Sequence, residues 1–504
     1  MFRLPRSSNF LGAVTLLLVF FFQAYTYDYL EIIELRPQST HMWRKTDCAS
    51  FALNYYNDGL NPFETRMHNE FNDAGQSIGE GPILYYLVGV AYSIFGPSEI
   101  IYRVIWLAIF FAGLLALQQL FFKAFQSLFW SVITPALVFS IPVIAFYAIG
   151  FITNVPALAI VFIAWYFFYD FIKNDKARSL WISVLFFFLA GWLKATALIS
   201  YFALLASGFV YLVIVLKSNI FSVVKKYWML LLPLVLNAFW YVGTVVYANQ
   251  SGNNYLSAKI FPIWQMSIED IRTAVEEFSA LWKGDYLNDQ TLWVYMALFA
   301  LAIIGFWRNR KLFITWLWLF SFLGFGSYVM FFFSAFEHHN YYGISLIFLI
   351  PATIFYLLSI FNKDFVITSS IGIISVWLLF QNISLSDGQQ DFRYNDWPNV
   401  AHVSRDLFDI EEELNKVGVG KNQKVISVPD QSPNISLYLM NRRGLTNFNK
   451  LHNNPDSVKK YIQKGYQFAV INNAKEKSQP YIQPFLGEKI LTKGEVEVFK
   501  LKLD

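Results

Sequence analysis

Cysteine and charge are the two features that this sequence has least of. Its 504 residues include one cysteine, Cys48, which excludes a disulfide within the chain and a metal cluster held by cysteines. Charged residues make up only 15% of the chain, whereas soluble globular domains carry about 25%. The sequence also contains no P-loop and no glycine-rich dinucleotide motif. These absences point away from a soluble nucleotide-binding enzyme and towards a chain that has lipid as its solvent.

The residues that the chain has in abundance also indicate a membrane protein. Hydrophobic residues make up 56% of the chain and aromatic residues 19%, with 52 phenylalanines. Such a composition is typical of lipid-facing helices with aromatic side chains at the membrane interfaces. The net charge of +4 is too small and too dispersed for a nucleic-acid-binding surface. We therefore predict an α-helical polytopic membrane protein that contacts membrane lipid and has no nucleic-acid partner.

Eleven apolar segments are long enough, at about 20 residues each, to cross a bilayer. They are residues 9–27, 98–122, 127–148, 151–172, 179–198, 199–217, 228–248, 290–307, 312–334, 341–361 and 365–383. If the N-terminus lies inside, the inner loops collect the cations, as the positive-inside rule requires. These cations are Lys123, Lys173, Lys176, Arg178, Lys217, Lys225, Lys226, Arg308, Arg310, Lys311 and Lys363. The first segment has no small-residue cleavage site after it, so we expect a retained helix; a cleaved signal peptide is the alternative.

Two long loops fall on the outer face. Residues 28–97 form the first, and its apolar stretch 82–95 is only about 21 Å long as a helix. This stretch is too short to span comfortably, so we expect it to lie in the outer interface. Residues 47–58 predict a short helix that Gly59 ends. The second loop, 249–289, is long enough to indicate a function, and we interpret it as a lid over a substrate site.

The composition changes to that of a soluble domain near the end of the last span. We therefore expect two domains, a transmembrane domain over residues 1–384 and a small α/β domain over residues 385–504 on the outer face. The predicted strands are 424–428, 468–472 and 495–501, and the predicted helices are 403–417 and 455–465.

Two acidic residues of the first loop are the first candidates for chemistry. Asp47 is suited to act as a general base on an acceptor hydroxyl; the alternative is a helix cap or an ion pair with Arg44. Glu80 lies between Gly79 and Gly81, which permit close approach of a ligand to the backbone. Glu80 is a candidate for holding a metal ion or a substrate, or is a solvated loop residue.

Basic and aromatic residues at outer ends of spans form the second set. An ionisable residue inside a span is a functional candidate, so Lys194 is expected to hold a lipid phosphate, or else to snorkel. Residues 338–342 combine two histidines with Asn340, Tyr341 and Tyr342, which suits phosphate or metal binding, or an interfacial aromatic belt. His41 has the same alternatives. A transporter is the competing function, but transporter sites lie at mid-membrane, whereas these residues gather on one face.

Two stretches of the first loop resemble a known family. HMWRKTDCASFALNYYNDG at 41–59 and GEGPILYYLVGVAYSIFGPSEIIYRV at 79–104 are similar to the first-loop signature of membrane glycosyltransferases with the GT-C fold. The bacterial branch related to protein mannosyltransferases and lipid A aminoarabinose transferases (glycosyltransferase family 39-like) is the nearest match. AGWLKATAL at 190–198, HNYYGISLIFLIP at 339–351 and PDQSPNISLYLMNRRG at 429–444 extend the resemblance.

The resemblance implies an activity and a place for it. A polyprenyl-phosphate-linked sugar is the implied donor, and a hydroxyl of a cell-envelope glycan, lipid or protein is the implied acceptor. Transfer would occur on the periplasmic face of the bacterial inner membrane, with the N-terminus cytoplasmic and the C-terminal domain periplasmic. A transporter or flippase of lipid-linked glycans remains the alternative, as does a ligase or oligosaccharyltransferase of the same fold that uses a pyrophosphate-linked donor.

The resemblance also implies residue roles. Asp47 matches the catalytic aspartate of the family, His41 and Arg44 match residues that accompany it, and Glu80 matches an acidic residue before the interfacial helix. Lys194, His339, Tyr341 and Tyr342 match positions that line the donor cavity near its phosphate. These residues are the predicted site.

Two departures from the family pattern change the expected ligands. Gly81 stands where the aminoarabinose transferases have a lysine, so phosphate contact is expected from Arg44 or Lys194. Asn154 stands where relatives often have an acidic residue. Both departures weigh against a bound divalent metal ion, the one cofactor under consideration, for which Glu80 is the candidate ligand.

Overall fold

The computed structural model describes residues 6–71, 75–77, 79–253, 255–256, 259–396, 403–451 and 455–503. The chain divides into two compact units that do not follow the sequence order. Unit 1 comprises Met1–Ile33, Arg103–Gly243 and Ala258–Phe392, and unit 2 comprises Glu34–Tyr102, Thr244–Ser257 and Arg393–Asp504. The first loop and the C-terminal part of the chain therefore belong to the same unit, although the spans separate them in sequence.

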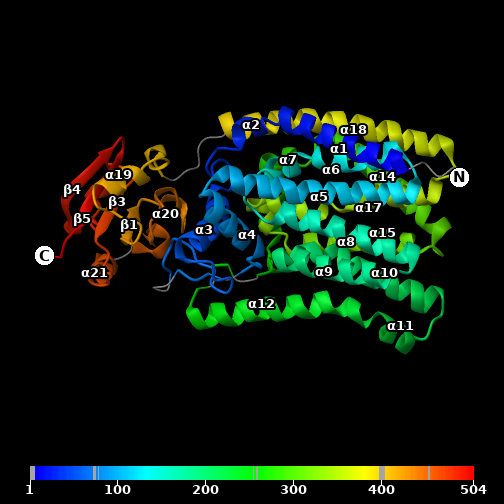
Figure 1. Cartoon of the computed structure of the whole chain (residues 1–504), viewed down its shortest axis with the longest axis horizontal. Helices are drawn as coiled ribbons and strands as arrows, with labels where there is room; N and C mark the ends of the chain where they lie inside the picture. The colour runs from blue at the N-terminus through cyan, green and yellow to red at the C-terminus, as the bar shows by residue number, and fades with distance from the viewer. Residues whose placement is uncertain are drawn as a thin grey trace. The chain divides into compact units, whose positions relative to one another are not determined.

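Unit 1 is built from α-helices, most of them long and apolar (Figure 1). They are α1 (Arg6–Thr26), α2 (Tyr29–Ile32), α5 (Glu99–Phe125, whose first turn belongs to unit 2), α6 (Leu128–Phe139), α7 (Pro142–Ala148), α8 (Asn154–Asn174), α9 (Ala177–Leu193), α10 (Ile199–Phe209), α11 (Ile220–Tyr227), α12 (Leu232–Ser251, whose last two turns belong to unit 2), α13 (Ile268–Glu277), α14 (Asp289–Asn309), α15 (Phe313–Phe331), α16 (Ala335–His338), α17 (Leu349–Phe361) and α18 (Phe365–Asp391). Among them α8 packs against α9, α10 against α15, and α1 against α6.

The described residues contain nine helical segments long and apolar enough to cross a membrane, or ten if α6 and α7 form one broken span. The chain is therefore a multi-pass membrane protein. Eleven spans were expected, and the difference lies at two places. The α6–α7 pair is bent by 76°, and α9, with 17 residues, is shorter than the other spans. Both segments exist where the sequence predicts them, but neither is one long straight helix.

Proline explains the break between α6 and α7. Pro142 has no backbone N–H, and it keeps the preceding residue out of the helical region. Ile141 accordingly has an extended backbone, with φ −71° and ψ 127°, and α7 begins with Pro142. The helix therefore restarts in a new direction.

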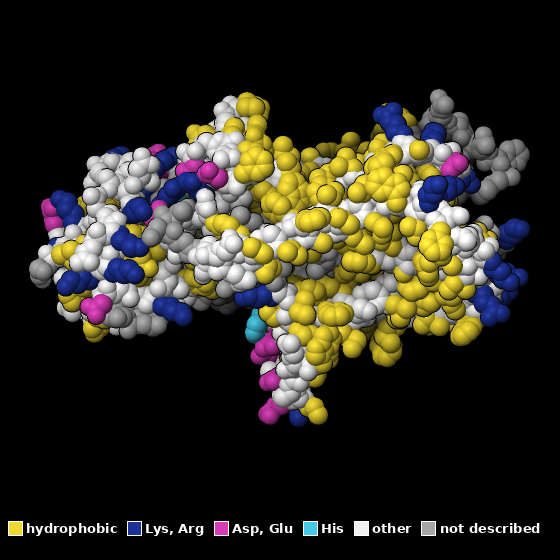
Figure 2. Space-filling view, turned by 90° about the horizontal axis from the view of Figure 1, so that it is seen from below, with side chains coloured by type: hydrophobic (Ala, Val, Ile, Leu, Met, Phe, Trp, Pro, Cys, Tyr) yellow, Lys and Arg dark blue, Asp and Glu magenta, His cyan; other side chains and the backbone are white. Residues whose placement is uncertain are grey.

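Hydrophobic side chains cover the surface of unit 1, and Lys and Arg side chains gather at one end of its helices (Figure 2). Exposed cations such as Lys173, Lys217, Arg310 and Lys363 lie at or beside the turns between consecutive helices. This is the distribution on which the predicted orientation rests. The orientation itself remains a prediction.

Two helices of the first loop form one part of unit 2. The helix α3 (Met42–Asp58) begins a turn earlier than predicted and ends at Gly59, whose φ of +94° suits glycine. The helix α4 (Ile83–Phe95) has 13 residues and packs on α3. A Cβ on Gly89 of α4 would meet the Cβ of Tyr55 at 2.5 Å, so the glycine lets the two helices approach closely. The short apolar helix is confirmed, and its place in the interface stays a prediction.

A five-stranded mixed sheet forms the rest of unit 2. Its strands are β1 (Val425–Val428), β2 (Gly444–Leu445), β3 (Phe468–Ile471), β4 (Leu486–Lys493) and β5 (Val496–Leu501), and its helices are α19 (Glu411–Lys416), α20 (Ile435–Met440) and α21 (Pro455–Gln463). The strand order is β2-β1-β3-β5-β4, with β2, β1 and β3 parallel and β5 and β4 antiparallel to their neighbours. All residues of β1 and β3 are buried, as expected for central strands.

The structure confirms the three predicted strands and the helix over 455–465, and it adds β4 and the two-residue β2. The predicted helix over 403–417 is wrong: residues 405–407 form a 3₁₀ turn, and α19 begins only at Glu411. Local polar contacts explain the interruption. Ser404 caps the 3₁₀ turn, and the Asp406 carboxylate accepts a hydrogen bond of 2.8 Å from the backbone of Glu495. Such side-chain contacts compete with a continuing helix.

Candidate active site

The first turns of α3 carry the predicted base. Asp47 is fully buried in unit 2, and its Oδ2 accepts a hydrogen bond of 2.7 Å from the Tyr255 hydroxyl. Burial raises the pKa of the Asp47 carboxyl to about 7, although Arg44 and the Tyr255 hydrogen bond lower it. A carboxylate whose pKa lies near neutrality is matched to general base catalysis at physiological pH.

The second acidic residue is paired with a cation. Arg44 Nη2 and Glu80 Oε1 form an ion pair, and the Tyr85 hydroxyl donates a hydrogen bond of 2.6 Å to the same Glu80 oxygen. Arg44 lies one turn before Asp47 on α3, so the helix brings both charges to one region. The structure thus unites Arg44, Asp47 and Glu80, as the sequence predicts. His41 immediately precedes α3, with a left-handed φ of +55°.

Two charged atoms in this group have no hydrogen-bond partner among the described residues. They are Asp47 Oδ1 and Arg44 Nη1, and both are buried. A buried charged atom without a partner is costly, so such atoms in a folded protein require an explanation. One acceptor and one donor are therefore available in the same region for a ligand that offers a hydroxyl and an anion.

Tyr255 was not among the predicted site residues. It lies just after α12, in the long loop interpreted as a lid, and reaches Asp47 across 208 positions of sequence. The Trp43 indole N–H donates to the Tyr255 hydroxyl, and Phe71 stacks on the Tyr255 ring at 5.7 Å. The polar and aromatic composition of that loop was the only signal in the sequence.

The C-terminal part of unit 2 also approaches Asp47. The Asn434 amide donates a hydrogen bond of 3.2 Å to the Thr46 carbonyl, and the charge of Asp430 contributes to the raised pKa of Asp47. Asp430 itself is buried and accepts hydrogen bonds from the backbone N–H groups of Ser432 and Ser436. The motif over 429–444 therefore belongs to the surroundings of Asp47, a place that the sequence did not predict.

The remaining predicted residues gather in unit 1. The His339 ring stacks against Tyr342 at 5.8 Å and lies 5.2 Å from Tyr341. Lys194 Nζ lies 5.6 Å from the centre of the Tyr342 ring. Asn154 donates a hydrogen bond of 3.0 Å to the Tyr341 carbonyl. The structure thus brings together four predicted residues, namely Lys194, His339, Tyr341 and Tyr342. Asn154, which stands where relatives often have an acidic residue, lies beside this cluster.

Two sets of residues are candidates for binding a metal ion. The Glu80 carboxylate already has the Arg44 guanidinium as its cation, so the residues around it do not fit an added metal ion. Among the described residues, Glu277, Glu337 and His338 of unit 1 offer ligand atoms within 4.8 Å of one another. His338 and Glu337 pair at 3.4 Å.

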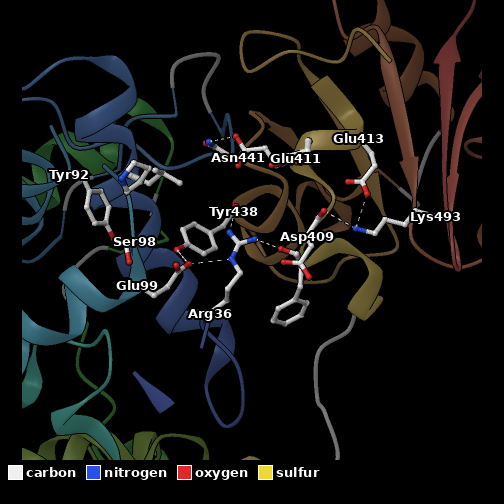
Figure 3. A pocket seen from close by; sticks show the side chains of 14 residues that line it. Arg36, Tyr92, Ser98, Glu99, Asp409, Glu411, Glu413, Tyr438, Asn441 and Lys493 are labelled. Carbon is white, nitrogen blue, oxygen red and sulfur yellow. Dashed lines mark hydrogen bonds and ion pairs between the residues drawn. The ribbon is translucent and has the colours of Figure 1, made fainter. Parts of the chain in front are cut away.

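Unit 2 also contains a cleft of about 590 Å³ (Figure 3). Arg36 lies at its wall, where it pairs with Glu99 at 3.3 Å and donates to the carbonyls of Phe408 and Leu439. Five carboxylates and two cations line the cleft; they are Glu99, Asp409, Glu411, Glu412, Glu413, Arg36 and Lys493. The excess of negative charge disfavours anionic ligands in this cleft.

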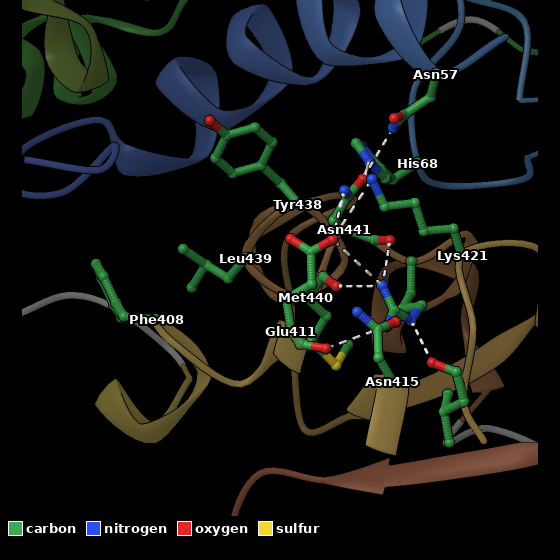
Figure 4. A network of polar contacts seen from close by, with 12 residues as sticks. Asn57, His68, Phe408, Glu411, Asn415, Lys421, Tyr438, Leu439, Met440 and Asn441 are labelled. Carbon is green, nitrogen blue, oxygen red and sulfur yellow. Dashed lines mark hydrogen bonds and ion pairs between the residues drawn. The ribbon is translucent and has the colours of Figure 1, made fainter. Parts of the chain in front are cut away.

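A polar network joins the first loop to the C-terminal part of unit 2 (Figure 4). Asn441 accepts a hydrogen bond of 2.9 Å from Asn57, lies 3.3 Å from His68 Nε2, and donates to Glu411. Burial lowers the pKa of His68 to about 3, so this histidine is neutral and serves as a hydrogen-bonding group. The network fixes the C-terminal end of α20 to the loop that carries Asp47.

No family model matches the sequence, and no curated protein matches it. The crystal structure of ArnT from Cupriavidus metallidurans bound to undecaprenyl phosphate matches with a TM-score of 0.59 and 11% identity, over 97% of both chains. The apo form of that protein matches with a TM-score of 0.58 and 11% identity, over 97% of both chains. The chain has the fold of ArnT. That fold confirms the predicted GT-C architecture of helical spans with a small C-terminal α/β part.

A third structure gives a weaker match. The apo oligosaccharyltransferase of Archaeoglobus fulgidus matches with a TM-score of 0.48 and 14% identity, over 95% of this chain and 73% of that one. ArnT and this chain cover each other almost completely. The likeness to ArnT thus includes both the spans and the C-terminal sheet.

Proposed function

We propose that the protein is a membrane glycosyltransferase that moves a sugar from a polyprenyl-phosphate donor to a hydroxyl acceptor. The pair of unpartnered buried atoms, Asp47 Oδ1 and Arg44 Nη1, carries this proposal. The transfer needs one group that accepts a proton from the acceptor and one that donates to the departing phosphate. The ArnT fold supports the proposal, because the ArnT crystal structure contains undecaprenyl phosphate.

The proposed reaction begins at Asp47. Its Oδ1 accepts the proton of the acceptor hydroxyl, and the acceptor oxygen forms a bond to the anomeric carbon of the sugar. The bond between that carbon and the phosphate oxygen breaks, and its electron pair leaves with polyprenyl phosphate. Arg44 Nη1 donates to the phosphate as negative charge develops on it, and a fixed cation stabilises such a charge most strongly in the transition state. No step is assigned to a metal ion.

Unit 1 supplies the proposed donor-binding groups. Lys194 and His339 are the proposed ligands of the donor phosphate, and Tyr341 and Tyr342 line the same cluster. An apolar cavity of about 310 Å³ also lies between helices of unit 1. Its lining includes Leu120, Trp165, Phe168, Leu204, Phe313 and Phe355. A cavity with such walls suits part of a prenyl chain.

The location follows from the same proposal. The proposed polyprenyl-phosphate donor supports a location in a bacterial inner membrane, and the cation distribution supports a cytoplasmic N-terminus. Residues 28–97 and 385–504 are then periplasmic. The contacts of Asn434 and Asp430 with the surroundings of Asp47 support a part for the C-terminal domain in covering the site or holding the acceptor.

Sugar transfer by the purified protein in lipid vesicles tests the proposal. A panel of radiolabelled polyprenyl-phosphate sugars is offered together with a membrane extract that supplies acceptors. Asp47→Asn removes the base, and Asp58→Asn, at the other end of α3, is the matched control. We expect wild type and Asp58→Asn to move label from lipid to acceptor, and Asp47→Asn to lose at least 99% of the rate, since an acid–base group contributes about 10²–10⁴-fold.

Two results contradict the proposal. Equal transfer by wild type and Asp47→Asn makes Asp47 a structural residue. Lipid-linked sugar that crosses the bilayer of the vesicles without moving to any acceptor makes the protein a flippase. Folding of both variants is checked by thermal unfolding followed through tryptophan fluorescence.

A further inference from the structure

Tyr255 contacts the base directly, and its hydrogen bonds have a defined direction. An ionised carboxylate only accepts hydrogen bonds, and an indole N–H only donates them. The Tyr255 hydroxyl therefore donates a hydrogen bond of 2.7 Å to Asp47 Oδ2 and accepts a hydrogen bond from the Trp43 N–H. The contacts form a chain from Trp43 through Tyr255 to the base.

Aromatic packing fixes the Tyr255 ring in this position. Phe71 stacks on one side, with an interplanar angle of 24°, and Phe448 lies 5.3 Å away at 72°. Phe448 also contacts the Trp43 ring at 5.6 Å. Residues from the first loop and from the C-terminal part of unit 2 thus hold a ring that comes from a third segment.

The consequence for Asp47 is that its two oxygens differ. Oδ2 is occupied by Tyr255, while Oδ1 is buried and has no partner within the described part of the chain. Rotation of the carboxylate out of its present orientation would break the contact with Tyr255. We propose that Tyr255 is a positioning residue, which holds Oδ2 so that Oδ1 faces the acceptor hydroxyl. This inference rests on the proposed glycosyl transfer and names a group that the transfer requires.

Tyr255→Phe tests the inference, because it removes the hydroxyl and keeps the ring. We expect kcat to fall about 10- to 100-fold, the range for one hydrogen bond to a charged group, while the KM for the donor stays within about twofold. The acidic limb of the kcat/KM profile should also move to higher pH, because the Tyr255 hydrogen bond lowers the pKa of Asp47. The other charged groups that act on Asp47, namely Arg44, Glu80 and Asp430, are unchanged in this variant.

The matched control is Tyr247→Phe. The Tyr247 hydroxyl donates a hydrogen bond of 2.7 Å to Gln76 in the same unit, but it does not touch Asp47. We expect this variant to keep the wild-type kcat and pH profile. Trp43→Phe, which removes the donor to the Tyr255 hydroxyl but keeps an aromatic ring beside Phe448, should give a smaller loss than Tyr255→Phe.

Each other outcome overturns the inference. Wild-type kcat and an unmoved acidic limb in Tyr255→Phe show that the hydroxyl does not position the base. Equal losses in Tyr255→Phe and Tyr247→Phe show a general effect on the segment.

A direct measurement separates this inference from the proposed function. The carboxyl band of Asp47 is identified in infrared difference spectra by its loss in Asp47→Asn, and is then titrated in wild type and in Tyr255→Phe. If the protein shows no transfer activity, glycosyl transfer is refuted. If Asp47 nevertheless titrates at higher pH in Tyr255→Phe than in wild type, the contact between Tyr255 and Asp47 is still supported. An unchanged titration refutes the contact itself.

Discussion

Arg44 forms an ion pair with Glu80, which lies 36 positions later in the first loop, and this pair acts on the neighbouring Asp47 in two ways. The positive charge of Arg44 lowers the pKa of Asp47, whereas the negative charge of Glu80 raises it. Because Glu80 also holds the guanidinium, it limits how far Arg44 neutralises the base. The pair therefore keeps Asp47 basic enough to take a proton.

The first prediction concerns the pH dependence of the proposed sugar transfer by the wild-type protein. Asp47 must be ionised to accept a proton, and burial raises its pKa to about 7. We expect kcat/KM to rise tenfold per pH unit below about pH 7 and to level off above it. Initial rates of transfer between pH 5 and 9 measure this. A profile that is flat down to pH 5 would mean that the base has an ordinary carboxyl pKa.

The second prediction separates the two partners of the pair. Glu80→Gln removes a negative charge near Asp47 and releases Arg44, so the acidic limb should move to lower pH. Arg44→Gln removes the positive charge, so the limb should move to higher pH. The two shifts are measured in the same rate assay and have opposite signs. Shifts of the same sign would show that the Arg44–Glu80 pair does not set the basicity of Asp47.

The third prediction concerns stability. Native Asp47 keeps its proton up to about pH 7, while an unfolded aspartate loses it near pH 3.8. The native state therefore binds more protons between these values, and its stability falls as the pH rises through them. Asp47→Asn removes this loss, so its Tm should exceed that of wild type by a few degrees at pH 8. At pH 4 the two Tm values should converge, and a constant difference would contradict the linkage.

The fourth prediction concerns Asn441, which joins the first loop to the C-terminal part of unit 2. Its φ of +51° is left-handed, and such a backbone costs most side chains about 1–2 kcal/mol. Asn441→Ala removes the amide hydrogen bonds and places alanine in a left-handed backbone conformation that it disfavours. Together these changes should lower the free energy of unfolding by about 3 kcal/mol. Asn441→Gly tolerates the left-handed backbone and removes only the amide, so the free energy of unfolding should fall by about 2 kcal/mol. Thermal unfolding in detergent ranks the variants, and equal losses would assign the whole effect to the amide.

The fifth prediction concerns the donor. Lys194 and the Tyr342 ring lie 5.6 Å apart in the cluster of unit 1. Lys194→Gln should weaken binding of undecaprenyl phosphate at least about tenfold, the loss for one charge-assisted hydrogen bond, whereas Lys194→Arg should retain most of it. Native mass spectrometry of the lipid-bound protein measures both. Lys283→Gln, which removes a cation that pairs with Asp289, should bind as wild type does.

Much of the fold could be predicted from local patterns. Long apolar segments, cations between them and short buried strands each depend on a few neighbouring residues. The predictions failed where contacts with residues distant in sequence determine the secondary structure. Asp406 is held by the backbone of Glu495, which no local pattern reveals. The two-residue β2 pairs with β1 and, through Gly444, with Asn69 of the first loop, and both partners are distant in sequence.

The candidate site was predictable to the same extent. Arg44 and Asp47 lie in one stretch of the first loop and Glu80 lies in a second stretch, and the resemblance to one family covers both stretches. Tyr255 and Asn434 come from segments 208 and 388 positions away from the residues they bond. Their contacts depend on how the segments fold together, and neither residue lies in a motif that indicates a role in catalysis.

The assembly of unit 2 from both ends of the chain has a consequence for biosynthesis. The Tyr466 hydroxyl bonds to Glu70 across 396 positions, and Gly444 pairs with Asn69 as a parallel bridge. A ribosome completes residue 70 long before residue 444, so the first loop emerges without the partners that bury it. Asp47 therefore acquires its final surroundings only after the last span has been inserted and the C-terminal strands have folded. Premature termination between the end of α18 and β1 would leave a full set of spans, but the first loop would lack its C-terminal partners.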